Sequence, residues 1–289
     1  MTMSKTTIID KEAARRIREG MKADCTKCFG LCCTALNIVA SSDFSINKQA
    51  GTPCLNLQPN YSCQIHSQLR DKGFKGCTVF DCLGAGQVVS QVTFKGQSWR
   101  GNPEIGKKMF QVFPIMEQLH EMIAYVSEAL SYELPEDIAD KLRIQLKKLQ
   151  NLTELAADDL LDLDLIMYRF SLNELLTIAS NFVREKAISK LPGNRNIKDL
   201  DHARVDWIGK KLEGKDLRAA DFRGAYLIAS DMRNTDLREV NFIGADLRDV
   251  NLDGADLSTS IFLTQMQINS AKGNEMTRLP IYIQKPSHW

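Results

Sequence analysis

The sequence lacks any long apolar run and any excess of charge of one sign. No stretch approaches the roughly 18–20 apolar residues that a membrane helix needs, and the first twenty residues have no apolar signal-peptide core. We therefore expect a cytoplasmic protein without membrane association. The 37 Lys and Arg residues balance 36 Asp and Glu residues, which argues against nucleic acid as a partner. GxGxxG, P-loop, GxSxG and HExxH motifs are absent too.

Cysteine is missing from every position after residue 82, so the cysteines before it carry information. All 8 lie within one short segment: Cys25, Cys28, Cys32, Cys33, Cys54, Cys63, Cys77 and Cys82. In a reducing cytoplasm this clustering favours thiolate–metal coordination over disulfides. Two thiolates that are separated by two residues, as in Cys25 and Cys28, can bind the same soft cation. Side chains of adjacent residues usually diverge, so Cys32 and Cys33 predict either two four-ligand sites or one polynuclear site.

We expect all eight cysteines to be metal ligands. Zn²⁺ is preferred because closed all-thiolate sites suit it, and an iron–sulfur cluster is the alternative. Gly30 and the turns around it would let backbone amides approach the sulfurs. His66 is the only histidine near the cluster, and its role as a ligand stays open, whereas His120 lies on an apolar helix face and predicts a core residue.

The cysteine segment also resembles a known family. It opens with CTKCFGLCC at residues 25–33 and continues with further spaced cysteines to residue 82. Over about residues 20–90 it is similar to the cysteine-cluster family described as zinc- or iron-chelating. The resemblance implies metal binding and no particular reaction. The family's Arg-Pro step is incomplete here, because Arg70 is not followed by proline.

Residues 1–103 form the first of three predicted domains, a Cys-rich metal-binding region. Asp10 predicts the N-cap of a short helix over residues 11–22. The stretch VVSQVTF at 88–94 is the best strand candidate of this region. Its apolar residues are scattered, so residues 25–82 are expected to fold around metal rather than around an apolar core.

Residues 104–191 predict an α-helical domain of three or four antiparallel helices. No glycine occurs between residues 107 and 190. Three runs of apolar residues at steps of three and four mark the buried faces: Met116, Leu119, Ile123, Val126 and Leu130; Ile138, Leu142, Leu146 and Leu149; Leu172, Leu175, Leu176, Ala179, Phe182 and Val183. The acidic run from Asp158 to Asp164 is interpreted as a solvated face or first helical turn.

Residues 197–289 contain a repeat of period five. Each fifth residue from Leu212 to Phe262 is Leu, Phe or Met, and from Ala220 to Ser260 small or β-branched residues stand two positions before these centres. Eight of the eleven positions just before the centres are Asp or Asn. A period of five fits neither a helix nor a flat strand, but it fits a coil that turns a corner every five residues. Stacked coils would then pair backbone to backbone.

Residues 210–264 resemble the pentapeptide-repeat family, through segments such as GADLR at 244–248 and GADLS at 254–258. The resemblance implies a right-handed quadrilateral β-helix with four repeats per coil, and eleven repeats imply nearly three coils. The period is lost near residue 267, so residues 263–289 predict a cap over the open end. The overall expectation is a multidomain chain with a Cys-rich region, a helical middle and a C-terminal β-helix.

Three functions remain open on this sequence. The preferred one is a thiolate metal protein whose β-helix is a scaffold for binding another protein. The second is an enzyme that uses a zinc or iron–sulfur centre and binds its substrate on the β-helix. The third follows from resistance members of the pentapeptide-repeat family, which mimic DNA and shield a topoisomerase. Residues 210–262 carry 10 acidic and 8 basic residues, a weak negative charge for such mimicry. A homodimer stays open.

Overall fold

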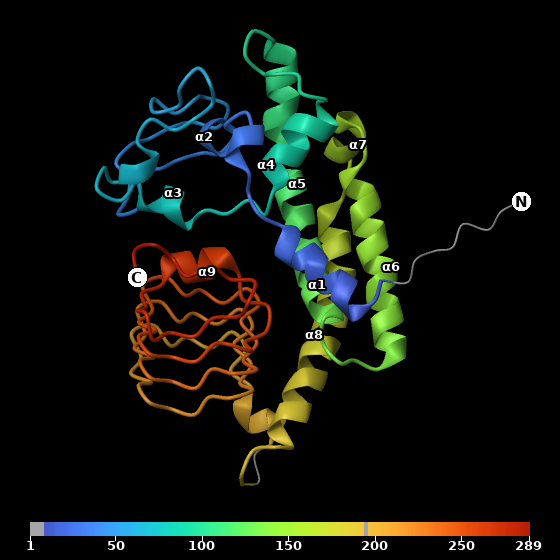
Figure 1. Ribbon diagram of the computed structural model, residues 1–289, viewed down its shortest axis with the longest axis vertical. Coiled ribbons are helices and arrows are strands. Elements are labelled where there is room, and N and C mark those ends of the chain that lie inside the picture. Colours follow the sequence, from blue (N-terminus) through green and yellow to red (C-terminus); the bar gives the residue numbers. More distant parts are fainter. Residues whose placement is uncertain (1–8, 194–195) are drawn as a thin grey trace, which may run out of the picture. The chain divides into compact units, whose positions relative to one another are not determined.

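The computed structural model describes residues 9–193 and 196–289. The chain divides into two compact units (Figure 1). Unit 1 consists of Met1–Gly73 and Cys82–Leu176, and unit 2 consists of Phe74–Asp81 and Thr177–Trp289. The predicted domains 1–103, 104–191 and 197–289 stay a prediction. No helix among the described residues combines the length and apolar character that a bilayer crossing requires.

Unit 1 contains several helices, and the apolar periodicity predicted the longer ones. They are α1 (Lys11–Gly20), α5 (Pro103–Leu130), α6 (Glu136–Thr153), α7 (Ala157–Leu161) and the first half of α8 (Leu165–Ile188). The expected cap of α1 is present, because the Asp10 carboxylate accepts a 2.7 Å hydrogen bond from Ala13 N. On α5 and α6 the predicted inner faces are buried, among them Met116, Leu119, Leu142 and Leu146.

The prediction of a strand at residues 88–94 is wrong. The segment is helical, with α4 (Ala85–Val88) followed by a π-helical turn (Val89–Thr93). The stretch VVSQVTF is rich in β-branched residues, which favours a strand, but the polar residues of this segment follow a helical period instead. Side chains at that spacing form hydrogen bonds with a stretch of backbone that is distant in sequence. The local sequence pattern does not show these contacts.

The remainder of the Cys-rich region has little regular structure. Its short elements are α2 (Leu31–Thr34) and 3₁₀ turns at Cys25–Lys27 and His66–Gln68, while α3 (Lys75–Val79) belongs to unit 2. Of the large apolar residues scattered through 25–82, Leu31, Ile38, Leu69 and Phe74 are buried, whereas Leu55 is 90% exposed. The region therefore has a small apolar core of its own.

The repeat block of unit 2 consists of stacked coils, drawn in orange to red in Figure 1. Isolated parallel bridges join residues 20 apart, for example Asp201 with Asp221 and Asp236 with Asp256. Twenty residues are four repeats of five, so the predicted register is confirmed. All eleven predicted centres from Leu212 to Phe262 are buried. Because the described residues of the block form bridges rather than strands, the right-handed β-helix itself stays a prediction.

The coil corners use the Asp and Asn column as expected. Each such side chain accepts a hydrogen bond from the backbone two residues later, as Asp216 does from Arg218 N at 3.3 Å and Asn241 from Ile243 N at 3.1 Å. The residue three positions after the Asp or Asn often has positive φ, for instance Ala219 at 59° and Gly254 at 69°. At Gly254 a β-carbon would lie 2.4 Å from Asn234 Oδ1, so glycine is also required there for space.

The repeat begins earlier than the Leu, Phe and Met pattern indicates. The bridges start at Asp201, and His202 and Trp207 occupy the first two central positions. The His202 ring stacks on Phe222 with centroids 5.6 Å apart, and the Trp207 ring meets Phe222 edge-on at 5.4 Å. Asp201 and Asp206 match the Asp and Asn column of the repeat and could have extended it to residue 201. The aromatic side chains that follow them do not match the Leu, Phe and Met centres.

The predicted C-terminal cap is present. Bridges from Asn251 to Lys272 and from Asp256 to Arg278 continue the coil beyond the repeats. Helix α9 (Gln265–Ser270) crosses the end of the block, and Ile268 joins the core. The Gln267 side chain donates 2.8 Å hydrogen bonds to Phe242 O and to Ala245 O. These bonds hold α9 over the last coil.

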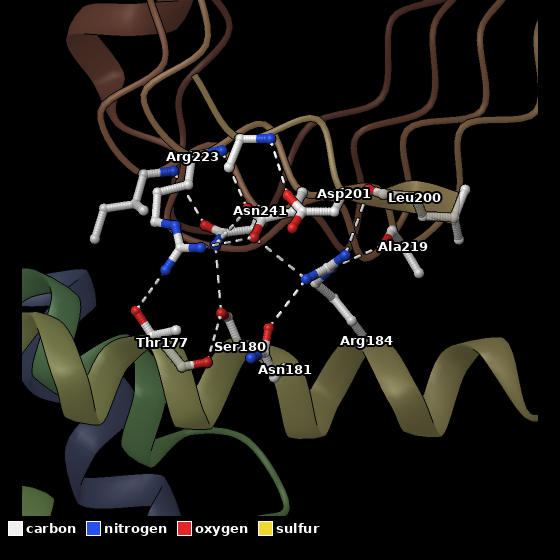
Figure 2. A network of polar contacts seen from close by, with 12 residues as sticks. Thr177, Ser180, Asn181, Arg184, Leu200, Asp201, Ala219, Arg223 and Asn241 are labelled. Carbon is white, nitrogen blue, oxygen red and sulfur yellow. Dashed lines mark hydrogen bonds and ion pairs between the residues drawn. The ribbon is translucent and has the colours of Figure 1, made fainter. Parts of the chain in front are cut away.

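A buried polar network joins the second half of α8 to the repeat block (Figure 2). The Arg184 side chain, 2% exposed, donates a 2.8 Å hydrogen bond to Ala219 O and lies 3.4 Å from the Asp221 carboxylate. Asn241, stacked on Asp221, donates to Ser180 Oγ at 3.3 Å. Burial lowers the pKa of Arg184, opposed mainly by Asp221. The side chains of Asp221 and Asn241, at this corner of the coils, therefore bind residues of α8.

Candidate functional site

The structure places seven of the eight predicted ligands in unit 1 and one in unit 2. Cys77 lies on α3, within the segment that belongs to unit 2. The other seven occupy the irregular segments around α2 and α4. Cys25 is exposed, Cys54 is buried, and the rest are partly buried. Sequence spacing alone could not distinguish Cys77 from the others.

The segment that carries Cys25 and Cys28 is held by side chains of α4 and the π-helical turn. Gln87 accepts from Asp24 N at 2.8 Å and donates to Lys22 O at 3.0 Å. Ser90 accepts from Phe29 N at 3.1 Å, and Gln91 donates to Lys27 O at 2.8 Å. These three residues lie at helical spacing on one face, so the helix fixes the backbone of residues 22–29.

Gly86 leaves room for two of the sulfurs. A β-carbon at this position would lie 2.7 Å from Cys28 Sγ and 3.8 Å from Cys82 Sγ. Both sulfurs are thus within 4 Å of the same point above the Gly86 backbone. Any larger residue would displace the Cys28 thiol, so this glycine is part of the site.

The Cys28 sulfur is surrounded by hydrogen-bond donors. The backbone amides of Gly30 and Leu31 and the Ser90 hydroxyl all favour its ionised form, while burial is the larger effect and raises its pKa. Gly30 has φ of 66°, and a β-carbon there would lie 2.7 Å from Leu57 Cδ1. The predicted approach of backbone amides to the sulfurs stays a prediction. Amide donors of this kind stabilise metal-bound thiolates.

Cys32 and Cys33 lie on α2, with their sulfurs 4.0 Å apart. The hydrogen bond between the two thiols raises the pKa of Cys32 well above its ordinary value and lowers that of Cys33. Burial also raises the pKa of Cys32, and the charge of Lys48 adds to the lowering at Cys33. Cys33 is the member of the pair whose surroundings favour a thiolate.

Cys54 and Cys63 approach Cys33 from a loop. Cys54 N donates to Cys33 O at 2.9 Å, which places the two residues side by side. An antiparallel bridge joins Leu57 to Cys63 and closes the loop. Burial raises the pKa of Cys63, with smaller effects from the charges of Cys33 and Cys54. Three thiols thus share one neighbourhood.

Lys48 is a functional residue that the sequence reasoning missed. It is 6% exposed, and its ammonium donates to the carbonyls of Thr34, Leu36 and Gln49. Burial lowers its pKa, and the charges that oppose this effect are those of Cys54, Cys33 and Cys32. No carboxylate within residues 9–193 and 196–289 forms an ion pair with it. A lone lysine among polar loop residues gives no sequence signal of such burial.

The two histidines of unit 1 have different environments. His66 is exposed, and its backbone amide donates to Cys63 O at 3.3 Å, next to a candidate ligand. His120 is buried, as expected for a core residue, and its Nδ1 donates to Leu83 O at 2.8 Å. Burial lowers the pKa of His120 and therefore favours the neutral ring.

The donors fit a soft metal in kind and, for one pair, in spacing. Two thiolates on one zinc ion are about 3.8 Å apart for Zn–S bonds of about 2.3 Å, and Cys32 and Cys33 are 4.0 Å apart. Among the described residues, no group of three or more His, Cys, Asp or Glu side chains is arranged so that it could hold a metal ion. The site is therefore a collection of thiols with amide donors and a buried cation around it.

Outside the cysteine region, the charged groups have structural partners. Asp158 forms an ion pair with Lys108, and Asp164 caps the start of α8, as the helix-turn interpretation predicts. On the repeats, outward arginines bind the aspartate two positions before them, as Arg238 does with Asp236. This pairing leaves little free positive charge for a phosphate track.

Comparison with known proteins identifies the repeats and a close relative. The pentapeptide-repeat family matches residues 211–262 in eight copies. The uncharacterized protein YybG of Bacillus subtilis (strain 168) is 50% identical over 274 residues, which cover 94% of this chain and 96% of the relative. The resemblance of residues 20–90 to the cysteine-cluster family stays a prediction. The chain therefore belongs to the family of YybG and carries pentapeptide repeats at its C-terminal end.

Proposed function

We propose that this protein binds zinc through the thiolates of its Cys-rich region and uses its repeat block as a scaffold for another protein. The observation that supports the first part is the buried ammonium of Lys48, on which the charges of Cys54, Cys33 and Cys32 act. A buried lysine without a carboxylate needs another source of negative charge, because an uncompensated charge is costly to bury. Metal-bound thiolates supply that charge at neutral pH.

The small apolar core of residues 25–82 supports the same proposal. A segment with four buried large apolar residues, Leu31, Ile38, Leu69 and Phe74, gains little from the hydrophobic effect. Ordering its backbone costs about 1–2 kcal/mol per residue. Coordination by residues far apart in sequence cross-links the segment, and structural zinc contributes an apparent free energy of about 10–16 kcal/mol in small domains.

The test is metal analysis of the full chain purified without oxygen and without affinity resins that carry metal. Elemental analysis gives the metal-to-protein ratio, and a thiol reagent counts reactive cysteines before and after denaturation. We expect about two zinc ions per chain and few reactive thiols in the native protein. Bound iron together with charge-transfer absorption would instead support an iron–sulfur cluster. Eight freely reactive thiols and no metal would refute the proposal.

The repeat block supports the scaffold part through its rigidity and its charge. Its centres form one continuous buried core, so its outer surface is held in a fixed shape. Its arginines are paired within the coils, and its net charge is close to zero, which favours a protein partner over a DNA-like rod. Tyr226 and Ile208 add exposed apolar area, at 53% and 55% exposure.

Cross-linking in the source cells tests the scaffold. A photoreactive amino acid at position 226 should capture one defined protein, and the same reagent at exposed Glu275 on the cap serves as a control. Recovery of the captured protein should fall in the variant Ile208→Glu. A gyrase supercoiling assay addresses mimicry directly, since inhibition by the purified chain would make DNA mimicry the better function.

A further inference from the structure

We propose that two copies of this chain pair edge to edge through the first coil of the repeat block. This coil comprises residues 201–220, at the end of the block away from α9 (Figure 1). Asp206 of each copy faces Lys211 of the second copy. The inference goes beyond the proposed function, because it concerns the end of the block and does not depend on metal.

The open edge follows from the way that successive coils pair. In each coil after the first, the residue at the position of the Asp and Asn column directs both of its backbone groups toward the preceding coil. Tyr226, for example, donates its N–H to Val205 O and accepts from Trp207 N, both at 2.8 Å. Asp231 forms the equivalent two bonds on the next side of the coil. One edge of each later coil is therefore satisfied inside the chain.

Asp206 and Lys211 stand at these same positions in the first coil, below Tyr226 and Asp231, and no coil precedes them. Within the part of the chain that the structure describes, no hydrogen bond joins the backbone N–H or C=O of either residue to another residue. Both residues are exposed. The first coil therefore presents an edge of unpaired backbone groups, which is a template for pairing with another chain.

The apolar core is also open at this edge. Val205 and Trp207 are only partly buried, whereas Ala225 and Leu227, directly above them, are fully buried. The Lys210 ammonium lies 3.8 Å from the centre of the Trp207 ring and covers part of it. The opposite end of the block is covered by α9, so the two ends differ. Association through the first coil would close the end that the chain leaves open.

The shape of the edge fits a second copy of this chain better than a single strand. The edge turns between Asp206 and Lys211, at Gly209 with φ of 64°, so a straight strand can pair with only one of the two residues. Another first coil turns at the same spacing. A two-fold axis reverses the chain direction, so the facing sides of two coils run antiparallel. In an antiparallel pair, two facing residues exchange both N–H···O bonds, as residues with both groups unpaired require.

The charges at the edge select the register. Asp206 opposite Lys211 gives two pairs of opposite charge, related by the two-fold axis. An axis through the Lys211 side would instead set Lys211 against itself and Asp206 against Asp216. Like charges directly opposite each other destabilise a strand pair. Residues 201–220 carry four acidic and five basic residues, so the two coils do not repel each other as a whole.

The test measures the mass of the full chain in solution over a range of concentrations by analytical ultracentrifugation. We expect the parent to reach twice the mass of one chain. Asp206→Lys and Lys211→Asp should each weaken the dimer by about tenfold or more, because both symmetric pairs become like-charged. An equimolar mixture of the two variants should recover the dimer, since the lysines of one variant then face the aspartates of the other.

Two further variants separate edge pairing from other effects of substitution. Asp246→Lys is the matched control, because Asp246 lies in the column of Asp206, two coils higher, with both backbone groups bonded inside the chain. It should leave the dimer unchanged. Lys211→Pro removes a backbone N–H that the chain itself does not use, so it should weaken the dimer while the circular dichroism spectrum stays as in the parent.

The outcomes are distinct from those for the proposed function. A parent that stays monomeric at every concentration overturns the inference and leaves the edge to a strand of a different protein or to water. A dimer that Asp206→Lys tightens has the alternative register, and a dimer that neither charge reversal changes uses another surface; either result overturns the assignment. Metal content does not enter these measurements, so the zinc proposal is tested separately.

Discussion

The repeat block and the Cys-rich region stabilise their backbones in different ways. In the repeats, every fifth side chain enters one core, and Leu227, Leu237, Phe242 and Leu257 are fully buried. In the Cys-rich region, long-range side chain to backbone hydrogen bonds replace such a core, for example from Trp99 Nε1 to Phe29 O at 2.8 Å. A periodic backbone satisfies its own hydrogen bonds by stacking, whereas an irregular one needs specific partners and cross-links.

Metal removal should give the largest effect and should separate the two regions. A strong chelator added to the full chain removes the thiolate cross-links, so residues 22–99 should lose their tertiary structure while the repeats keep theirs. Trp99 reports on the first region and Trp207 on the second. We expect the fluorescence of a Trp207→Phe, Trp289→Phe variant to shift to the red, and that of a Trp99→Phe variant to stay nearly constant. Equal shifts in both variants would show that the regions do not differ in this way.

Truncation of a repeat centre should be the next largest effect. Leu237 is fully buried in the coil, so Leu237→Ala should lower the free energy of unfolding by about 2–5 kcal/mol through cavity formation. Chemical denaturation followed by circular dichroism measures the change. The metal-to-protein ratio should stay as in the parent, because the damage is confined to unit 2. A loss below 1 kcal/mol would mean that the register is misassigned.

Loss of the buried Arg184 should cost about 3 kcal/mol. Arg184→Met removes the cation from the Asp221 carboxylate and leaves Ala219 O without this donor. Asp221 keeps Arg223, 3.3 Å away, so the cost should stay near the low end for buried pairs. In a double-mutant cycle, Asp221→Asn should be less harmful when Arg184 is already methionine. Additive effects would show that the two side chains are not coupled.

The sequence predicted the repeat block in detail, because its period of five specifies which side chains are buried and which stand at the corners. The centres, the corner aspartates and the cap were all visible, and only the aromatic first coil was missed, since His202 and Trp207 do not match the other centres. In the Cys-rich region, the eight cysteine ligands stay a prediction, and the sequence did not show which cysteines lie near one another. Gly86 and Lys48 act through contacts between distant segments, and Val89 to Thr93 form a helix for the same reason. Local patterns do not carry that information.

Acid should destabilise unit 1 through His120. Its pKa is lowered by burial, so below the unfolded value of about 6.5 the unfolded state binds a proton that the folded state resists. The stability that His120 contributes is complete above that pH and falls as the pH drops toward the lowered folded pKa. His120→Asn keeps a donor for Leu83 O and should flatten the pH dependence of unfolding between pH 7 and 5. An unchanged slope would exclude His120 as its source.

The smallest effect is expected at an outward arginine of the repeats. Arg238 binds Asp236 on the coil surface, and its side chain is 40% exposed. The carboxylate raises the pKa of Arg238, but surface ion pairs contribute little to stability because water screens them. Arg238→Ala should therefore change the free energy of unfolding by less than about 0.5 kcal/mol. Asp236 also accepts from the backbone of residue 238, so Asp236→Ala should cost more than Arg238→Ala by removing the corner hydrogen bond. If Arg238→Ala proves more damaging than Leu237→Ala in the same denaturation assay, the inward and outward positions of the repeat are reversed.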